Sequence, residues 1–298
     1  MVSAKKDNNN CNISNNNNGA SIEKISWEAA VDLIKNDAAM KKLVIDSFFD
    51  DPVTAAAERF YNGSEWRAAR ALIAELFGSN YRPGAMSAID IGAGRGIASY
   101  ALAMDGWSVT ALEPYKSRTA GNLAIADLIE GFKLEKITIA EDYGESLKFA
   151  GGSFDLVYMR QALHHARDLE KFCMEAARVL KPCGVFIAAR EHVLSCRGDL
   201  RCFLHNHPLH KYYGGENAYT LSEYRSAIEK SGIKLSAVLK TYDSDINLYP
   251  ETREALMGRL TVKIGFRPPG FIFNLVLKFF NMINKVPGRL YTFAGVKL

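Results

Sequence analysis

The feature that most constrains this 298-residue chain is the glycine-rich run from Asp90 to Gly96. An apolar segment, residues 87–91, leads into Gly92, Gly94 and Gly96, and a helix-like pattern follows. Glycine has no Cβ, so a turn built from it can adopt positive φ angles and let a ligand approach the backbone closely. The run therefore predicts a buried strand, a tight turn and a helix, with a binding site at the turn.

Short apolar runs alternate with helical patterns after this turn. The predicted strands are 87–91, 108–112, 136–139, 154–159, 184–189, 233–241 and 289–296, and helices are expected at about 95–104, 117–131, 168–180 and 220–230. Strands that alternate with helices are typical of right-handed βαβ units. We therefore expect an α/β fold, with a doubly wound, Rossmann-like, seven-stranded and mostly parallel sheet.

The chain divides into three regions, and the last of them contains this pattern. Residues 1–20 are Asn-rich and are expected to be a disordered tail, and residues 21–82 read as an N-terminal helical cap. Residues 83–298 would form the main domain. Within it, two segments that do not alternate, at about 190–219 and 242–288, are expected to be lid insertions beside the binding face, because loops on such scaffolds carry substrate contacts.

An acid at the end of the second predicted strand indicates that the ligand contains a nucleoside. In an open parallel sheet the ligand lies beyond the carboxyl ends of the strands, where both the glycine turn and Glu113 are predicted. A carboxylate there can accept hydrogen bonds from both ribose hydroxyls. The dinucleotide pattern G-x-G-x-x-G is not met, because its third glycine position holds Ile97. A nicotinamide-dependent oxidoreductase therefore becomes the alternative.

Four segments in order resemble class I S-adenosylmethionine-dependent methyltransferases. They are the D-x-G-x-G-x-G run, the acid at Glu113, the strand and loop of residues 153–165, and the Arg-Val-Leu-Lys-Pro-Cys-Gly turn of residues 178–184. In the last segment Cys183 replaces a glycine of the family, which we expect to affect the turn rather than the chemistry. The resemblance covers about residues 85–190.

The resemblance implies S-adenosyl-L-methionine as cofactor and assigns residues to it. The glycine loop would lie against the amino-acid and ribose parts. Asp90 would support the loop or reach the amino group through water, and Glu113 would hold the ribose. Asp142, favoured over the adjacent Glu141, would read the adenine amino group. Arg160, at the end of the fourth strand, is counted with the cofactor-binding residues.

Histidines supply the candidates for catalysis. His164 and His165 follow the fourth strand, where the family places residues near the transferred methyl group, and either could be a general base. For His164 the alternative is packing beneath the cofactor. His192 follows the fifth strand in Arg190-Glu191-His192 and would face the acceptor. No metal is expected, because the His/Cys-rich segment matches no fixed metal motif; its candidate ligands are His192, Cys196, Cys202, His205, His207 and His210.

The C-terminal region is cationic and apolar. Seven lysines and arginines, and no acid, follow Glu254. In residues 271–285, Asn274, Lys278, Asn281 and Lys285 recur at helical spacing and leave a broad apolar face elsewhere. This pattern leaves two alternatives: a helix packed on the core or on a second subunit in a homodimer, or peripheral contact with a membrane surface.

These observations together predict an enzyme that transfers methyl groups to a small molecule, with an oxygen of a sugar or glycolipid as first expectation. No nucleic acid is expected, since the Asn/Asp-Pro-Pro-Tyr/Phe motif of base methyltransferases is missing. A non-catalytic member of the fold that binds a partner at a membrane is a further alternative. An odd number of cysteines, five, without a CxxC pair predicts a reduced, cytoplasmic protein, with the membrane contact as the open alternative.

Overall fold

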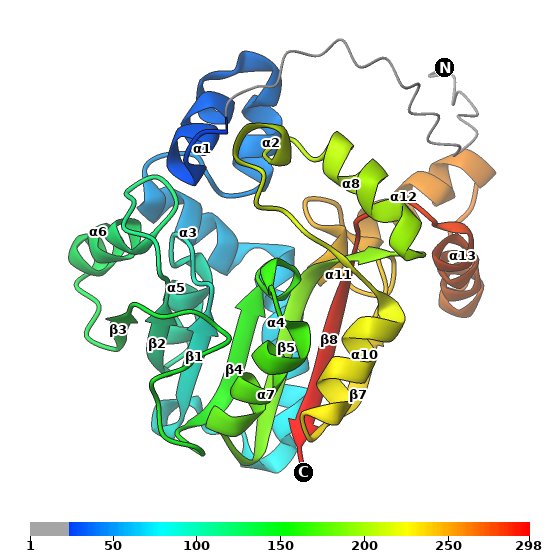
Figure 1. Ribbon diagram of the computed structural model, residues 1–298. Helices are drawn as coiled ribbons and strands as arrows, with labels where there is room; N and C mark the ends of the chain where they lie inside the picture. Colours follow the sequence, from blue (N-terminus) through cyan, green and yellow to red (C-terminus); the bar gives the residue numbers. More distant parts are fainter. Residues whose placement is uncertain (1–23) are drawn as a thin grey trace.

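The computed structural model describes residues 24–298, so the Asn-rich tail expected at 1–20 lies outside the described residues. Its centre is one twisted sheet in the order β3-β2-β1-β4-β5-β8-β7, and a two-residue strand, β6, pairs with β5 (Figure 1). The expected seven-stranded α/β fold is confirmed. The strands are β1 (Ser87–Ile91), β2 (Ser108–Leu112), β3 (Ile137–Ala140), β4 (Phe154–Arg160), β5 (Leu180–Leu194), β6 (Tyr219–Thr220), β7 (Ile233–Leu239) and β8 (Arg289–Lys297).

Strand direction changes on one side of the sheet. β1 to β5 pair in parallel, whereas β8 lies antiparallel between β5 and β7. β1 and β2 have the predicted bounds. β5 is longer than predicted: it continues to Leu194, past a register shift between Ala188 and Glu191. Arg190 lies at this register shift and has φ of +59°. Because β5 continues to Leu194, Arg190-Glu191-His192 belongs to the sheet and not to a loop.

Helices cover both faces of the sheet. Apolar side chains of α3 to α6 pack on one face, and those of α7 and α10 pack on the other. The α-helices of the described residues are α1 (Trp27–Asn36), α2 (Lys41–Asp46), α3 (Val53–Asn62), α4 (Ser64–Phe77), α5 (Ile97–Met104), α6 (Asn122–Phe132), α7 (Leu169–Val179), α8 (Leu200–Asn206), α9 (His210–Tyr213), α10 (Leu221–Lys230), α11 (Asp245–Leu248), α12 (Arg253–Ile264) and α13 (Gly270–Ile283).

The N-terminal helices share their core with the sheet. Phe60 and Trp66 are fully buried in the same apolar cluster as β1 and α5. On α4, the buried Glu65 accepts hydrogen bonds from Arg160 at the end of β4, at 2.6 and 3.0 Å. The same carboxylate lies 3.7 Å from the Arg190 guanidinium of β5. A buried charge is tolerated only when it is paired, so this network ties α4 to the carboxyl ends of two central strands.

The predicted C-terminal helix is present as α13, but its buried side differs from the expectation. Asn281, assigned by its spacing to the polar stripe, is 7% exposed and donates to Asp243. Phe273 and Leu277 pack against α12, whereas the apolar side chains of the opposite side face outward. In Figure 1, α12 and α13 stand at the edge of the molecule, beyond β8. None of the described helices is long and apolar enough to cross a membrane.

Candidate active site

A cavity of about 1430 Å³ opens at the carboxyl ends of β1, β2, β4 and β5. Ligand cavities usually measure about 300–1,000 Å³, so this one has room for a cofactor and an acceptor together. Nine of the ten predicted site residues line it, and Gly96 does not. Gly96 instead begins α5 with φ of +79°, where a Cβ would stand 3.0 Å from Ile125. It therefore shapes the turn without facing the ligand space.

The glycine turn is held by backbone hydrogen bonds and needs glycine at two positions that face the cavity. The N–H groups of Gly92 and Ala93 both donate to Leu112 O, at 2.9 and 3.0 Å. Gly92 and Gly94 have φ of +71° and +55°, values that favour glycine. A Cβ on Gly92 would stand 2.7 Å from the Cβ of Ala162 in the loop after β4. The turn thus approaches that loop too closely for a side chain.

Two carboxyl groups at this turn have raised pKa values. Glu113 is 5% exposed, and its two oxygens accept from the N–H groups of Gly94 and Tyr115, at 2.9 and 3.1 Å. Burial raises the pKa of Glu113 to about 7, although those two hydrogen bonds oppose the shift. Asp90 is buried too and accepts from Ser99 Oγ at 2.6 Å, and burial raises its pKa to about 6. Glu113 carries two positioned oxygens that can face a ribose.

Of the two adjacent acids after β3, the structure places Asp142 at the cavity. Asp142 lines the cavity, and its oxygens accept from the N–H groups of Tyr143 and Lys148, at 2.9 and 3.1 Å. Glu141 is exposed and instead accepts from Asn122 Nδ2 at 3.2 Å. Of the two acids, Asp142 is therefore the one that lines the cavity.

Arg160 lines the cavity, but its hydrogen bonds point elsewhere. Its Nε and Nη2 donate to Glu65, and its Nη1 donates to Gln161 Oε1 at 2.9 Å. The sequence offered no sign of this partner, which lies 95 residues earlier on α4. We therefore interpret Arg160 as a residue that holds the cavity wall, and not as a direct cofactor ligand.

Three histidines meet at one part of the cavity, and each has its Nδ1 engaged. His164 Nδ1 lies 2.7 Å from Glu191 Oε2, His165 Nδ1 lies 3.3 Å from Gly215 O, and His192 Nδ1 lies 2.7 Å from Gly288 O. Carbonyls and carboxylates only accept, so each Nδ1 carries the proton. The Nε2 atoms of the three rings consequently carry the lone pair when the rings are neutral.

Burial and neighbouring charges set the protonation of these rings. For His164, burial alone would lower the pKa, but its hydrogen bond to Glu191 and the negative charges of Glu191 and Glu216 outweigh burial and raise the pKa to about 9. Burial, together with the positive charge of His164, lowers the pKa of His165 to about 4. The same two causes lower the pKa of His192 well below its ordinary value. His164 is thus the charged member of the group.

Two buried carboxylates of this cluster were not predicted as site residues. Glu191 is fully buried and accepts from the backbone N–H groups of residues 162–164 as well as from His164. Glu216, 7% exposed, accepts from Tyr213 Oη at 2.7 Å and lies 3.6 Å from His164 Nε2. Glu191 follows the predicted strand 184–189 and is flanked by Arg190 and His192, so in the sequence it has the polarity of a loop residue. Glu216 carried no distinguishing signal either.

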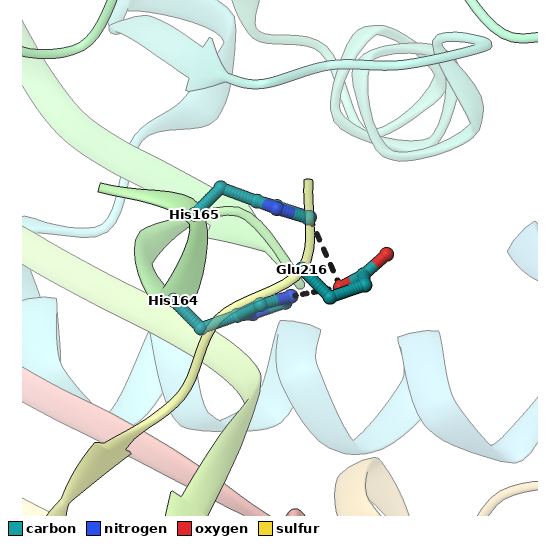
Figure 2. A group of neighbouring side chains, drawn as sticks. All are labelled: His164, His165 and Glu216. Atoms are coloured by element: carbon teal, nitrogen blue, oxygen red, sulfur yellow. Dashed lines mark ion pairs between the residues drawn. The ribbon is translucent and has the colours of Figure 1, made fainter. Parts of the chain in front are cut away.

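The metal-ligand set considered from the sequence is not assembled at this cavity. Of its six residues, only His192 and His207 line the cavity. Among residues 24–298, the one group with metal-ligand geometry is a different one: His164, His165 and Glu216, whose ligand atoms lie within 4.8 Å of one another (Figure 2). The histidines follow β4, and the glutamate comes from the segment before β6.

Comparison with known proteins identifies the central segment. Residues 89–188 match the family model described as a methyltransferase domain. The 2-methyl-6-phytyl-1,4-hydroquinone methyltransferase of Synechocystis is 32% identical over 120 residues, 39% of this chain and 36% of that protein. The ubiquinone biosynthesis O-methyltransferase of Methylobacterium sp. strain 4-46 is 32% identical over 108 residues, 35% of this chain and 40% of that protein. The first relatives are matched over only 30–41% of their own length.

Solved structures share the fold at low sequence identity. Haemonchus contortus phosphoethanolamine N-methyltransferase 2 aligns with a TM-score of 0.55 and 18% identity, covering 92% of this chain and 61% of that one. The [4+2]-cyclase SpnF aligns with a TM-score of 0.52 and 16% identity, covering 78% and 81%. Because the matched family model, the sheet order and the glycine turn agree, residues 89–188 are a methyltransferase domain of the class I S-adenosylmethionine-dependent type.

Proposed function

We propose that the protein transfers the methyl group of S-adenosylmethionine to a hydroxyl oxygen of a small molecule. The observation that carries the proposal is the division of the cavity into two chemically different sides. One side has the glycine turn, Glu113 and Asp142, and suits a nucleoside cofactor. The other has imidazole and carboxylate groups, which suit an acceptor hydroxyl that must lose its proton.

The transfer itself is an in-line displacement. The acceptor oxygen releases its proton at the histidine–glutamate cluster, and an oxygen lone pair forms the new bond to the methyl carbon. The carbon–sulfur bond breaks, its electron pair stays on sulfur, and S-adenosylhomocysteine is left. Without a bound cation, His165 and His192 are the candidate proton acceptors, because each has a free Nε2 at the cavity. Positioning of the two reactants supplies much of the remaining rate acceleration.

Exposed apolar side chains support an acceptor with an apolar tail, met at a membrane surface. On α13, Phe271, Leu275 and Met282 are 61–68% exposed. Val262 and Phe266, in and just after α12, are 86% and 61% exposed. Exposed large apolar side chains gathered on two successive helices are typical of an interaction site. We call these five residues and the helices that carry them the apolar hairpin.

Charge favours a lipid surface as the occupant of the apolar hairpin. Lys263, Lys278 and Lys285 accompany it, and none of the three forms an ion pair within the described part of the chain. Lysines beside an interfacial apolar helix attract anionic lipid head groups, each by about 1 kcal/mol. The expectation of a helix buried within its own subunit does not hold for this side of α13.

Chain connections link the apolar hairpin to the cavity. Pro250 lines the cavity shortly before α12, and Leu290 lines it shortly after α13. Between α13 and Leu290, Gly288 O accepts the hydrogen bond that orients His192. An amphiphile could therefore keep its tail at the hairpin and its hydroxyl head in the cavity. Glycolipids and tailed phenols, the latter related to the hydroquinone named for the Synechocystis relative, share this chemistry.

Release of S-adenosylhomocysteine from S-adenosylmethionine tests the proposed activity. The acceptor panel contains polyprenylated phenols, glycolipids and their tail-free analogues, and Glu113→Ala serves as the cofactor-site control. We expect release only with a hydroxyl acceptor, and more with a tailed one. Binding of S-adenosylmethionine without release across the panel and with cell extract would support the non-catalytic alternative instead. Stabilisation by NAD but not by S-adenosylmethionine would support the oxidoreductase.

Vesicle sedimentation tests the membrane contact. The intact protein should sediment with vesicles of phosphatidylcholine mixed with phosphatidylserine, and less with phosphatidylcholine alone. Leu275→Glu should reduce sedimentation, whereas Leu33→Glu, at a 51% exposed leucine of α1, should not. Equal loss in both variants, or no sedimentation of the intact protein, argues against the contact. A dimer in solution that Leu275→Glu converts to a monomer would assign the hairpin to a second copy of the chain.

A further inference from the structure

We propose that His164, His165 and Glu216 bind a divalent transition-metal cation, Zn²⁺ by preference, which holds the acceptor oxygen in the cavity. The inference rests on the proposed function for the identity of the bound oxygen, but not for the cation site itself. Figure 2 shows both imidazole rings directed toward the Glu216 carboxylate.

The distances from both imidazole rings to Glu216 are close to those of a zinc site. His164 Nε2 lies 3.6 Å and His165 Nε2 lies 3.8 Å from Glu216 Oε2. Zinc–nitrogen and zinc–oxygen bonds of about 2.0–2.1 Å in tetrahedral geometry place neighbouring ligand atoms about 3.4 Å apart. The pairs with Glu216 are therefore within a few tenths of an ångström of this value. Two nitrogens and one carboxylate also form the ligand set of zinc sites that keep a position open for substrate.

The surroundings orient the ligands as metal-binding histidines require. Metal-ligating histidines usually donate their other ring N–H to a carboxylate or a backbone carbonyl. His164 Nδ1 has Glu191 as partner at 2.7 Å, and His165 Nδ1 has Gly215 O at 3.3 Å. Both Nε2 atoms are thereby left as the coordinating atoms. Glu191 is itself fixed by three backbone N–H groups, so the orientation of His164 is determined by the fold.

One buried oxygen that has no hydrogen-bond partner among the described residues, and the negative charges of Glu191 and Glu216, favour a cation site here. Glu216 Oε2 is buried and has no hydrogen-bond partner, and the side chain is 3% exposed. Within residues 24–298, no lysine or arginine forms an ion pair with Glu216 or Glu191. Two buried carboxylates therefore face the imidazole rings with no cationic lysine or arginine of this part of the chain paired to them. A divalent cation bound between the imidazoles and Glu216 would balance both negative charges.

The cation would act on the acceptor through its open position. The cluster lines the cavity, so a hydroxyl oxygen can reach the fourth coordination position from the ligand space. A Lewis acid there lowers the pKa of the bound hydroxyl and keeps the resulting oxyanion in place. The proton leaves to solvent, and the oxygen lone pair then attacks the methyl carbon. With the cation bound, His165 is a ligand, and a histidine base at that position is not needed.

Direct titration of the untagged, chelator-treated protein with Zn²⁺ tests the inference without any acceptor. We expect one equivalent per chain, with a dissociation constant of about 1 µM or tighter. Removing a residue that hydrogen-bonds a metal ligand typically weakens metal binding about 10–100-fold. Glu216→Gln and His165→Ala change a ligand itself, so they should weaken Zn²⁺ binding at least as much. His205→Ala, at an exposed histidine outside the cavity, is the matched control and should bind like the wild type.

The variants must also be shown to fold. Each should bind S-adenosylhomocysteine with the wild-type affinity, because the cofactor side does not include the cluster. No Zn²⁺ binding by the wild type, or equal binding by the wild type and the two cluster variants, would overturn the inference. Mg²⁺, which prefers oxygen ligands, should not compete with Zn²⁺. Zinc binding without any acceptor methylation would contradict the proposed function and leave the cation site standing.

Discussion

We predict that Glu113 makes cofactor affinity depend on pH. Burial raises its pKa to about 7, and in the proposed site its ionised form would accept two ribose hydrogen bonds in addition to those from Gly94 and Tyr115. The carboxyl group is protonated below pH 7, so affinity should fall as the pH falls. Between pH 8 and pH 6 the ionised fraction drops from about nine-tenths to about one-tenth, which predicts about tenfold weaker binding, or ~1.4 kcal/mol.

Isothermal titration with S-adenosylhomocysteine at pH 8, 7 and 6 measures this dependence. Glu113→Gln is the matched variant, since it keeps the size of the side chain but does not titrate. It should bind more weakly at pH 8, because one accepting carboxylate oxygen becomes an amide NH2 group that cannot accept a ribose hydrogen bond, at a cost of about 1–3 kcal/mol. Asp90 titrates in both proteins, so the difference between them isolates Glu113. An equal pH slope in both proteins would refute the reasoning.

Two further substitutions test the fold around the cavity, each by thermal or urea unfolding. Glu65→Gln should cost about 3–5 kcal/mol of stability, because it leaves two buried arginines without their counter-charge, while Glu75→Gln at an exposed position should stay within about 0.5 kcal/mol. Equal losses would disprove the role of the network. Gly92→Ala should destabilise more than Gly152→Ala: both have φ of +71°, but only the first Cβ meets another side chain, at 2.7 Å. A larger loss for Gly152→Ala would contradict this.

The cofactor side could be predicted from the sequence because its determinants are local. The glycine turn, the strand before it and Glu113 lie within residues 87–113, and the bounds of β1 and β2 are those expected. A buried strand followed by alternating glycines strongly favours a tight turn at that position. The departure from the family pattern at Cys183 is also local, because this cysteine itself adopts φ of +60° at the position where that pattern has glycine.

The acceptor side could not be predicted in the same way, because its parts meet only in three dimensions. Arg190-Glu191-His192 has the polarity of a loop, yet it lies within β5. Its charges are tolerated there only because Glu65 and His164 pair with them. Neither partner is near in sequence. For α13, helical periodicity identified a polar and an apolar side. Periodicity alone does not determine which side packs against the rest of the protein. Asn281 belongs to the polar stripe and is nevertheless buried.

The origin of the lining residues explains why the family identifies the cofactor and not the acceptor. The glycine turn, Glu113 and Asp142 all lie within the matched residues 89–188. Most of the opposite wall comes from outside that segment: from α1, the end of β5, the residues before β6 and the turn after α11. Cofactor contacts are therefore constrained by the family, while the acceptor wall is free to differ. Substrate identity must be sought in residues such as His192 and Glu216, which lie outside the matched domain.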